Sequence, residues 1–453
     1  MPASPVDALR GIVGPAHVLT GADCGPYVLD GRAPEAVVLP GSKEEVAAVL
    51  LAAGEADLPV TPWGGGTKMG IGAPPQRLGL VLGLKRLNRL LEHEPGDLTA
   101  TVQAGMTLGA LQRELGTRGQ WLSLDPAHAD EATLGGIVSS NAAGPRRHLY
   151  GACRDLVIGL TVVTAAGTLV KGGGKVVKNV AGYDLPKLFV GAFGTLGVIV
   201  EATVKLRPRP DADRMVVARF ASLKEAGSAA RAVMGSDLLP SALDLVDGET
   251  LRALELGGPD GAALLIGVDG IAEQVHWQCT EVERMLRLQG LVDARVLDAD
   301  ARDAAWRARG GLGRGAFPET AAVMRWVVLP AQVADVMEQG MGVALRAGLP
   351  VALAAHAGVG VVEAVLAGGE GADATKVSDV LIEWRTLVRA AGGQALVESA
   401  PLAIKERVPV WDDLGPALRI MQRIKSQLDP SGLLNPGPFD CPQGRRSGHA
   451  SPG

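Results

Sequence analysis

Apolar and polar positions near the start of the chain follow a strand–helix–strand pattern. Residues 36–40 form a short β-like apolar run, and Ser42 with Glu45 three positions later makes a capping box, which predicts the start of a helix. An extended run over residues 58–62 comes next, and the glycines at 64–66 follow it directly. A glycine cluster after a strand lets the backbone approach a ligand closely.

The same alternation continues as far as residue 210. The expected elements are strands over 98–102, 156–164, 167–171 and, after a glycine turn, within 194–207, and a helix over 107–115. The second and third of these strands meet at Ala165-Ala166-Gly167, which predicts a hairpin. A proline-rich stretch over 208–211 then marks the clearest boundary in the chain.

Beyond this boundary, strands and helices still alternate. Strands are expected over 215–220, 263–269 and 322–329, and helices over 222–234, 271–289, 331–347 and 414–428. This alternation predicts a second domain of the α+β class. The segment after residue 440 consists largely of Gly, Pro, Ser and Arg and is expected to be a disordered tail.

Composition and charge narrow the class of protein. The hydrophobic fraction of 47% and the charged fraction of 21% are those of a soluble globular chain. A net charge of −5 gives no basic field, so no nucleic-acid partner is expected. No secretory signal and no direct membrane span are recognised, so a cytoplasmic location is expected, with attachment to a membrane through a partner left open.

The cysteines exclude a metal cluster on this chain. Cys24, Cys153, Cys279 and Cys441 lie far apart, with no C-x-x-C pair. Iron–sulfur clusters need grouped thiolates, so isolated reduced cysteines are expected. Electrons that leave through an iron–sulfur relay would need another chain to carry it.

Two common phosphate-binding motifs are absent, because the residues that they require do not occur at the required spacing. The glycines at 64–66 lack the later glycine of a G-x-G-x-x-G series, because Met69 stands there. A Walker loop ending at Lys175 would need glycine at Leu169 and Ser or Thr at Val176. Kinase, ATPase and Rossmann classes are therefore excluded.

Two runs of small residues remain to be explained. The glycines at 64–66 can expose backbone N–H groups to a diphosphate, although a flexible turn explains that loop equally well. The run over 133–144 is too long for a turn, and Asn141 and two adjacent serines in it can hydrogen-bond a flat heterocycle. The second run therefore favours a large planar ligand lying against the backbone.

Four motifs in order resemble a known family. They are Trp63-Gly64-Gly65-Gly66-Thr67-Lys68, Thr133-Leu134-Gly135-Gly136…Asn141-Ala142-Ala143-Gly144, Lys178-Asn179-Val180-Ala181-Gly182-Tyr183-Asp184 and Gly194-Thr195-Leu196-Gly197-Val198-Ile199. Together they resemble the FAD-binding domain of the vanillyl-alcohol oxidase / p-cresol methylhydroxylase superfamily. Within it, the sequence is most similar to the FAD-binding subunits of glycolate oxidase called E subunits, whose closing segments resemble residues 397–401, 410–411 and 429–437.

The resemblance implies a fold. A p-cresol methylhydroxylase-type FAD-binding domain of two α/β subdomains is expected over 30–208, divided into about 30–95 and 96–208. An α+β cap domain, an antiparallel sheet with helices, is expected over 212–440. Residues 1–29 would be an N-terminal segment and 441–453 the disordered tail.

The resemblance also implies the FAD contacts. The pyrophosphate is expected at Gly64, Gly65, Gly66, Thr67, Lys68 and Gly72, the flavin and ribityl chain at Thr133, Gly135, Gly136, Ser140, Asn141 and Gly144, and the adenine or ring system at Val198 and Ile199. The FAD is expected to be noncovalent, because the first loop has no histidine and Cys153 is expected in the core.

One motif of the relatives is incomplete here. The D-2-hydroxy acid dehydrogenase branch carries a metal-holding H-x-G-D-G-x-x-H stretch and a later Glu-His pair. In this chain valine replaces the acidic residue after His356, no second histidine follows, and Glu398 precedes a serine. One histidine and one glutamate are too few ligands for a divalent metal, so no metal is expected.

Hydroxy-acid oxidation by a flavin needs a base for the hydroxyl proton and often an arginine for the carboxylate. The candidates are Lys178, Tyr183, Arg325 and His356, each of which is equally well explained as a surface charge or a core polar group. Lys178 and Tyr183 are favoured because they lie within a motif of the family. The sequence alone places none of them beside the ring.

Three functions follow. The first is an FAD-binding subunit of a complex oxidising a small 2-hydroxy acid, glycolate or D-lactate, with a second flavin subunit and an iron–sulfur subunit as partners. The second is a stand-alone FAD-dependent dehydrogenase or oxidase of another hydroxylated substrate. The third is a structural subunit with a vestigial flavin site, which the intact glycine loops argue against.

Overall fold

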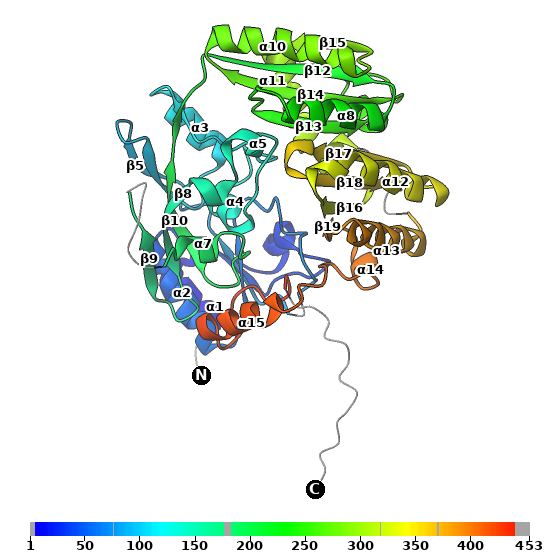
Figure 1. Cartoon of the computed structure of the whole chain (residues 1–453). Coiled ribbons are helices and arrows are strands. Elements are labelled where there is room, and N and C mark those ends of the chain that lie inside the picture. The colour runs from blue at the N-terminus through cyan, green and yellow to red at the C-terminus, as the bar shows by residue number, and fades with distance from the viewer. Residues whose placement is uncertain (1–4, 76, 176–182, 318, 369–370, 440–453) are drawn as a thin grey trace.

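The computed structural model describes residues 5–75, 77–175, 183–317, 319–368 and 371–439. Within them the chain forms three main sheets, of four, five and eight strands. The first two sheets make up one half of the molecule and the eight-stranded sheet makes up the other (Figure 1). The predicted α+β fold is confirmed.

The four-stranded sheet has the order β1-β2-β4-β3. Its strands are β1 (Val18–Leu19), β2 (Ala36–Val38), β3 (Val60–Trp63) and β4 (Leu80–Gly83). Strands β2, β4 and β3 run parallel, and helix α2 (Lys43–Glu55) connects β2 to β3. The predicted cap is present, since Ser42 Oγ accepts a hydrogen bond from Glu45 N at 3.1 Å.

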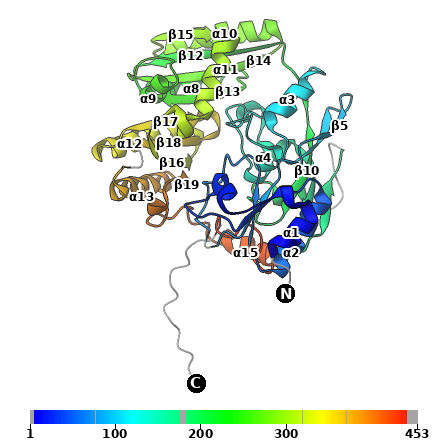
Figure 2. The same cartoon turned by 180° about the vertical axis from the view of Figure 1, so that it is seen from behind.

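The N-terminal segment belongs to this sheet. Helix α1 (Pro5–Val13) lies beside α2, as seen from behind in Figure 2, and buries Leu9 and Val13 in the same core. Strand β1 pairs with β2. Residues 5–29 are therefore an integral part of the sheet.

The five-stranded sheet is antiparallel, in the order β5-β6-β10-β8-β9. Its strands are β5 (Leu90–Glu94), β6 (Thr99–Gln103), β8 (Val157–Val163), β9 (Leu169–Gly173) and β10 (Val198–Lys205). Its helices are α3 (Leu108–Gly116), α4 (Leu134–Ser140), α5 (Arg147–Tyr150), α6 (Cys153–Leu156) and α7 (Pro186–Phe189). The predicted hairpin is confirmed as β8–β9. A short pair, β7 (Gln120–Trp121) with β11 (Arg207–Pro208), lies outside this sheet.

Helix α4 was not expected within the small-residue run 133–144. Thr133 caps it, its Oγ1 accepting a hydrogen bond from Gly136 N at 3.3 Å. Ile137 and Val138 bury one face of the helix. The adjacent glycines have low helix propensity, which tertiary packing overrides here.

The eight-stranded sheet is antiparallel, in the order β15-β12-β14-β13-β17-β18-β16-β19. Its strands are β12 (Ala212–Phe220), β13 (Ala242–Asp247), β14 (Ala262–Gly270), β15 (Asp293–Leu297), β16 (Thr320–Val327), β17 (Val351–His356), β18 (Val361–Ala367) and β19 (Gln394–Ser399). One core joins it to α8 (Leu223–Met234), α10 (Ala272–Leu286), α12 (Val333–Arg346) and α13 (Ala374–Ala390). A second core joins it to α9 (Gly248–Ala253) and α11 (Ala299–Gly310).

After β19 and the short helix α14 (Leu402–Lys405), the chain returns to the first half. Helix α15 (Ala417–Leu428) lies at the bottom of the molecule in Figure 1, near the labels of α1 and α2. Leu434 bridges Val60 at the start of β3, and Asn435 Nδ2 donates to Phe193 O at 2.6 Å. Residues 434 and 435 thus contact the strand that leads into the first glycine cluster and the turn before β10.

The carboxylate of Asp429 organises this return. Its two oxygens accept hydrogen bonds from Leu433 N at 2.9 Å and Leu434 N at 2.8 Å, and Asp429 is 2% exposed. Lys425 pairs with the same carboxylate. The buried segment therefore depends on one side chain for two of its backbone hydrogen bonds.

We predict that Asp429→Ala lowers the free energy of unfolding by about 2–4 kcal/mol, because two buried N–H groups lose their acceptor. Chemical denaturation of the whole chain measures this loss. Ser431→Ala is the matched control, since Ser431 lies in the same turn, is exposed and makes only a long contact of 3.4 Å with Asp429 Oδ1. An equal loss in both variants would show that the carboxylate does not organise the turn.

Candidate functional site

A small cavity of about 80 Å³ lies at the turn after β3. It is lined from both ends of the chain. The lining includes Gly64, Gly65, Gly66, Thr67, Lys68 and Met69 from the turn, Gly136, Ser139 and Ser140 from α4, and Phe193, Asn435, Pro436 and Pro438. The structure therefore brings the two predicted small-residue runs together.

The turn is glycine-rich because it presses against the segment before α4. A Cβ on Gly65 would lie 1.9 Å from the backbone oxygen of Glu131, and one on Gly64 would lie 2.1 Å from Thr133 Oγ1. Gly66 has a φ of +79°, which other residues rarely adopt. Side chains at these positions would push the turn away from α4.

Gly136 is different, because the one atom close to a Cβ there belongs to the side chain that caps its own helix. The nearest atom to a Cβ there would be Thr133 Oγ1 at 3.2 Å, and Gly136 lines the cavity. Ser140 Oγ, one helical turn on, donates to Gly136 O at 2.7 Å and keeps its acceptor capacity. This face of α4 can therefore receive a ligand against its backbone.

Three other residues predicted to contact FAD are involved in packing or in hydrogen bonds within the protein. Gly135 faces Ala104 on the opposite side of α4, and Gly72, with a φ of +103°, packs against Pro438. Asn141 ends α4 in the left-handed conformation, and its Oδ1 accepts from Arg154 N at 3.2 Å. None of the three lines the small cavity.

Val198 and Ile199 are buried in β10, where they pair with β8. Neither lines the small cavity or the larger one described next. Their contact with the adenine or the ring system stays a prediction.

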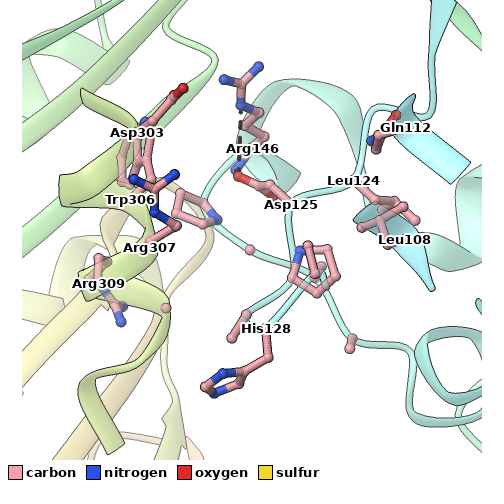
Figure 3. Close-up of a pocket in the computed structure, with 18 of the residues that line it drawn as sticks. Leu108, Gln112, Leu124, Asp125, His128, Arg146, Asp303, Trp306, Arg307 and Arg309 are labelled. Carbon is pink, nitrogen blue, oxygen red and sulfur yellow. Dashed lines mark hydrogen bonds and ion pairs between the residues drawn. The ribbon is translucent and has the colours of Figure 1, made fainter. Parts of the chain in front are cut away.

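A larger cavity of about 790 Å³ separates the first half of the molecule from the eight-stranded sheet. Figure 3 shows Asp125, His128 and Arg146 on one wall and residues of α11 on the other. Lys68 lines both cavities, so the glycine turn leads into the larger one, which Gly144 also lines. The volume falls within the range of about 300–1,000 Å³ typical of small-molecule sites.

On the sheet side, a buried network surrounds Asp244, which is 0% exposed on β13. Its Oδ1 lies 2.8 Å from His356 Nδ1, and its Oδ2 accepts from Arg309 Nε at 2.9 Å. Burial alone would raise the pKa of Asp244, but the interactions with His356 and Arg309, which both hydrogen-bond to the carboxylate, outweigh burial and hold the pKa below its usual range. The carboxylate is therefore ionised and can fix the imidazole.

Glu398, at the end of β19, forms a second compensated group. It pairs with Lys68, 3.5 Å away, and with Arg325 on β16. Burial raises its pKa, but Arg325 and then Lys68 outweigh burial and lower the pKa overall. An ionised Glu398 thus ties the glycine turn to the sheet across the cavity.

Arg146 forms a third group at the opposite end of the cavity. It pairs with Asp213 and, at 3.1 Å, with Asp269, which lie on β12 and β14. Its guanidinium also lies 5.0 Å from the ring centroid of Trp121, a cation–π distance. These contacts join the two halves of the molecule.

Two of the four catalytic candidates from the sequence line the larger cavity, Arg325 and His356. Tyr183 is 93% exposed and lines neither cavity. Lys178 lies outside the described residues. Their catalytic roles stay predictions.

The sequence interpretation missed Asp244, Arg309 and Glu363. They come from β13, α11 and β18, so no local motif unites them. Asp244 gave one usable signal, because a single carboxylate inside the apolar strand 242–246 requires a buried partner. Counted from His356, Glu363 holds the position of the second histidine in the H-x-G-D-G-x-x-H motif.

His128, on the opposite wall, was also missed. Its Nε2 is buried and has no hydrogen-bond partner among the described residues. Burial, followed by the charge of Arg314, lowers its pKa. A neutral imidazole there can hydrogen-bond a ligand in the cavity.

Cys153 is unsuited to covalent attachment of a cofactor. It is buried, and burial, with Asp155 second, raises the pKa of its thiol to about 12. A thiol that stays protonated is a poor nucleophile. This agrees with the expectation of noncovalent FAD.

The glycine turn and α4 lie beside the larger cavity, and the eight-stranded sheet covers the other side of that cavity. This arrangement suits a protein that binds a long cofactor in its first half and a substrate against the sheet. The sequence comparisons agree. The family model of the FAD binding domain matches residues 34–173, and that of the C-terminal domain of FAD linked oxidases matches residues 209–439. The chain therefore belongs to the FAD-linked oxidase family, and its cofactor is FAD.

Individual relatives cover nearly the whole chain. The glycolate oxidase subunit GlcD of Bacillus subtilis is 29% identical, over 91% of this chain and 90% of its own length. A D-lactate dehydrogenase of Anaerostipes hadrus is also 29% identical, over 94% and 95%. The structure of p-cresol methylhydroxylase with substrate bound matches with a TM-score of 0.76 at 19% identity, over 96% of each chain.

These comparisons confirm the predicted membership of the FAD-linked oxidases, the fold and FAD as the cofactor. The glycolate oxidase relative carries the name of the D subunit, so the likeness to E subunits stays a prediction. The predicted FAD contacts also stay predictions, supported by the glycine turn and α4.

We predict that Gly136→Leu yields a folded chain with little or no FAD, because the side chain would fill the open face of α4. Gly11→Leu is the control, since a Cβ on that helical glycine meets nothing within 4 Å. Absorbance of purified protein gives the flavin content, and circular dichroism confirms folding. Normal flavin content in Gly136→Leu would place the FAD elsewhere.

Proposed function

We propose that this chain is an FAD-dependent oxidoreductase acting on the CH–OH group of a small 2-hydroxy acid, glycolate or D-lactate. The observation that carries the proposal is the cavity of about 790 Å³ that continues from the glycine turn and is lined by Lys68, Arg325 and His356. Cationic groups attract a carboxylate, and an imidazole can accept the hydroxyl proton. Glycolate oxidase and D-lactate dehydrogenase among the relatives support the same substrate class.

The FAD would be held noncovalently, with the small cavity receiving only part of it. Residues 64–68 would supply backbone N–H groups to the pyrophosphate, and the face of α4 at Gly136 would receive the flavin end. When bound, FAD supplies the acceptor for the hydride equivalent from the substrate carbon. The proposed division is an FAD-binding part over 30–208 and a cap from residue 212, and it is supported by the family matches over 34–173 and 209–439.

His356 is the catalytic base in this proposal. Asp244 accepts the Nδ1–H hydrogen bond and so leaves Nε2 free to take the hydroxyl proton. No hydrogen bond from a described residue reaches Nε2. Nε2 would hold the proton that leaves the substrate hydroxyl, and bound FAD would supply the acceptor for the hydride of the C–H bond.

The chain works as the FAD-binding subunit of a complex, accepting or relaying electrons. Its expected partners are a second flavin subunit and an iron–sulfur subunit, since the cysteines of this chain are too scattered to hold a cluster. The proposed location is the cytoplasm. Within the described residues, no helix is long and apolar enough to cross a membrane.

The alternative is a stand-alone dehydrogenase or oxidase of another hydroxylated substrate. The buried Asp244–His356 pair on the cavity wall is compatible with it, because this acid–base pair would also serve a chain that oxidises its substrate without partner subunits. Activity of the isolated chain separates the two proposals.

We predict that the isolated chain shows flavin bands that bleach when glycolate or D-lactate is added anaerobically. His356→Ala should slow this bleaching by about 10²–10⁴-fold, the usual contribution of a general base, with the flavin content unchanged. His276→Ala, on the far helix α10, is the control. Bands that persist in the wild type would favour an electron-relaying subunit, and an unchanged rate in His356→Ala would exclude this histidine as the base.

A further inference from the structure

A buried arginine bridges two carboxylates on the cavity wall. Arg309, at the end of α11, has a side chain that is only 2% exposed. Its Nε donates to Asp244 Oδ2 at 2.9 Å, and its Nη1 donates to Glu363 Oε2 at 2.7 Å. Burial opposes the positive charge, but Asp244 and then Glu363 outweigh burial and raise the pKa of Arg309. The guanidinium is therefore a permanent fixed charge.

An imidazole completes the group. His356 Nδ1 contacts the second oxygen of Asp244, so Asp244 joins His356 to Arg309. Asp244, His356 and Glu363 come from β13, β17 and β18, which are adjacent in the sheet. Two carboxylates and an imidazole are the groups that commonly bind a divalent metal.

The guanidinium separates these groups. Across the described residues, no three His, Cys, Asp or Glu side chains are placed to hold a metal ion together. A buried carboxylate without a counter-charge is costly, so Asp244 and Glu363 need a cation. Arg309 supplies it, and its Nη2 is buried without a partner among the described residues.

We propose that Arg309 is a built-in cation that takes the position of a divalent metal in this cavity, so that this half of the site works without a metal ion. The inference rests on the proposed function only in assigning the cavity to the substrate. Because no metal competes for the imidazole, His356 keeps its outer nitrogen for proton transfer. A fixed guanidinium also makes this chemistry independent of metal supply.

The proposal predicts that removing the guanidinium creates a metal site. Arg309→Ala leaves the carboxylates of Asp244 and Glu363 at a vacated cation position, with His356 still bound to Asp244. Isothermal calorimetry with MnCl₂ or ZnCl₂, on full-length proteins first treated with EDTA, should show about one tightly bound ion in this variant. The wild type and Arg309→Lys, which keeps a cation, should bind none at this position.

Two further variants locate the binding. Arg307→Ala removes an exposed arginine of the same helix that lines the same cavity, and it should behave as the wild type. The double variant Arg309→Ala/Glu363→Gln should lose at least about tenfold in metal affinity relative to Arg309→Ala. This pattern would assign the ion to the position of the guanidinium.

Stability gives an independent readout, because Arg309→Ala leaves two carboxylates without their partner and is expected to lower the melting temperature. MnCl₂ should raise the melting temperature of Arg309→Ala and leave that of Arg307→Ala unchanged. If Arg309→Ala folds only when purified with MnCl₂, that result supports the proposal. Failure to fold with the metal as well as without it, or a folded variant that binds no metal, overturns the proposal.

Metal binding by the wild type would also overturn the proposal if Glu363→Gln weakened that binding, because the ion would then lie at the position of the guanidinium. If EDTA abolished flavin reduction in the wild type and MnCl₂ restored it, the proposal would likewise be overturned. The same result would support the proposed oxidation of the hydroxy acid. Because the titrations need neither flavin nor hydroxy acid, a wild type without flavin or activity would count against the proposed function alone. The two failures are therefore distinguishable.

Discussion

The close contact between the glycine turn and the segment before α4 determines the cofactor half of the site. A Cβ on Gly65 would overlap the backbone oxygen of Glu131, which cannot move like a side chain. The turn after β3 therefore stays at a fixed distance from α4, and the open face at Gly136 lies beside it. Lys68, at the end of this turn, then reaches the second cavity. One backbone contact thus sets where a cofactor and a substrate can meet.

Charge compensation shapes the substrate half. Glu398 is neutralised by Lys68 and Arg325, and Asp244 by Arg309 together with His356. The desolvation cost of buried charges is offset only when they are paired with good geometry. The cavity can therefore stay polar and keep a substrate carboxylate among fixed cations, without leaving an unpaired charge in the protein.

Local signals predicted several elements well. The Ser42 cap of α2, the Thr107 cap of α3 and the hairpin β8–β9 formed where expected, because caps and tight turns depend on neighbouring residues. Helix α4 was missed because its glycines argue against a helix, and burial of its apolar face decided otherwise. The return of the C-terminal segment to β3 depends on the long-range contact of Leu434 with Val60 and on Asp429, which no local pattern describes.

The sequence by itself determined the FAD-linked oxidase family, the cofactor and the two small-residue runs, because close backbone approach restricts residue type locally. It also placed Arg325 and His356 among the candidates, but it could not separate them from Tyr183, which is almost fully exposed. Only the tertiary structure brought Arg309 to Asp244 and Glu363, since they lie on separate elements of the cap. Ion pairs between distant segments produce no recognisable spacing of residues in the sequence. The order of the strands in the sheet decides which charged side chains meet.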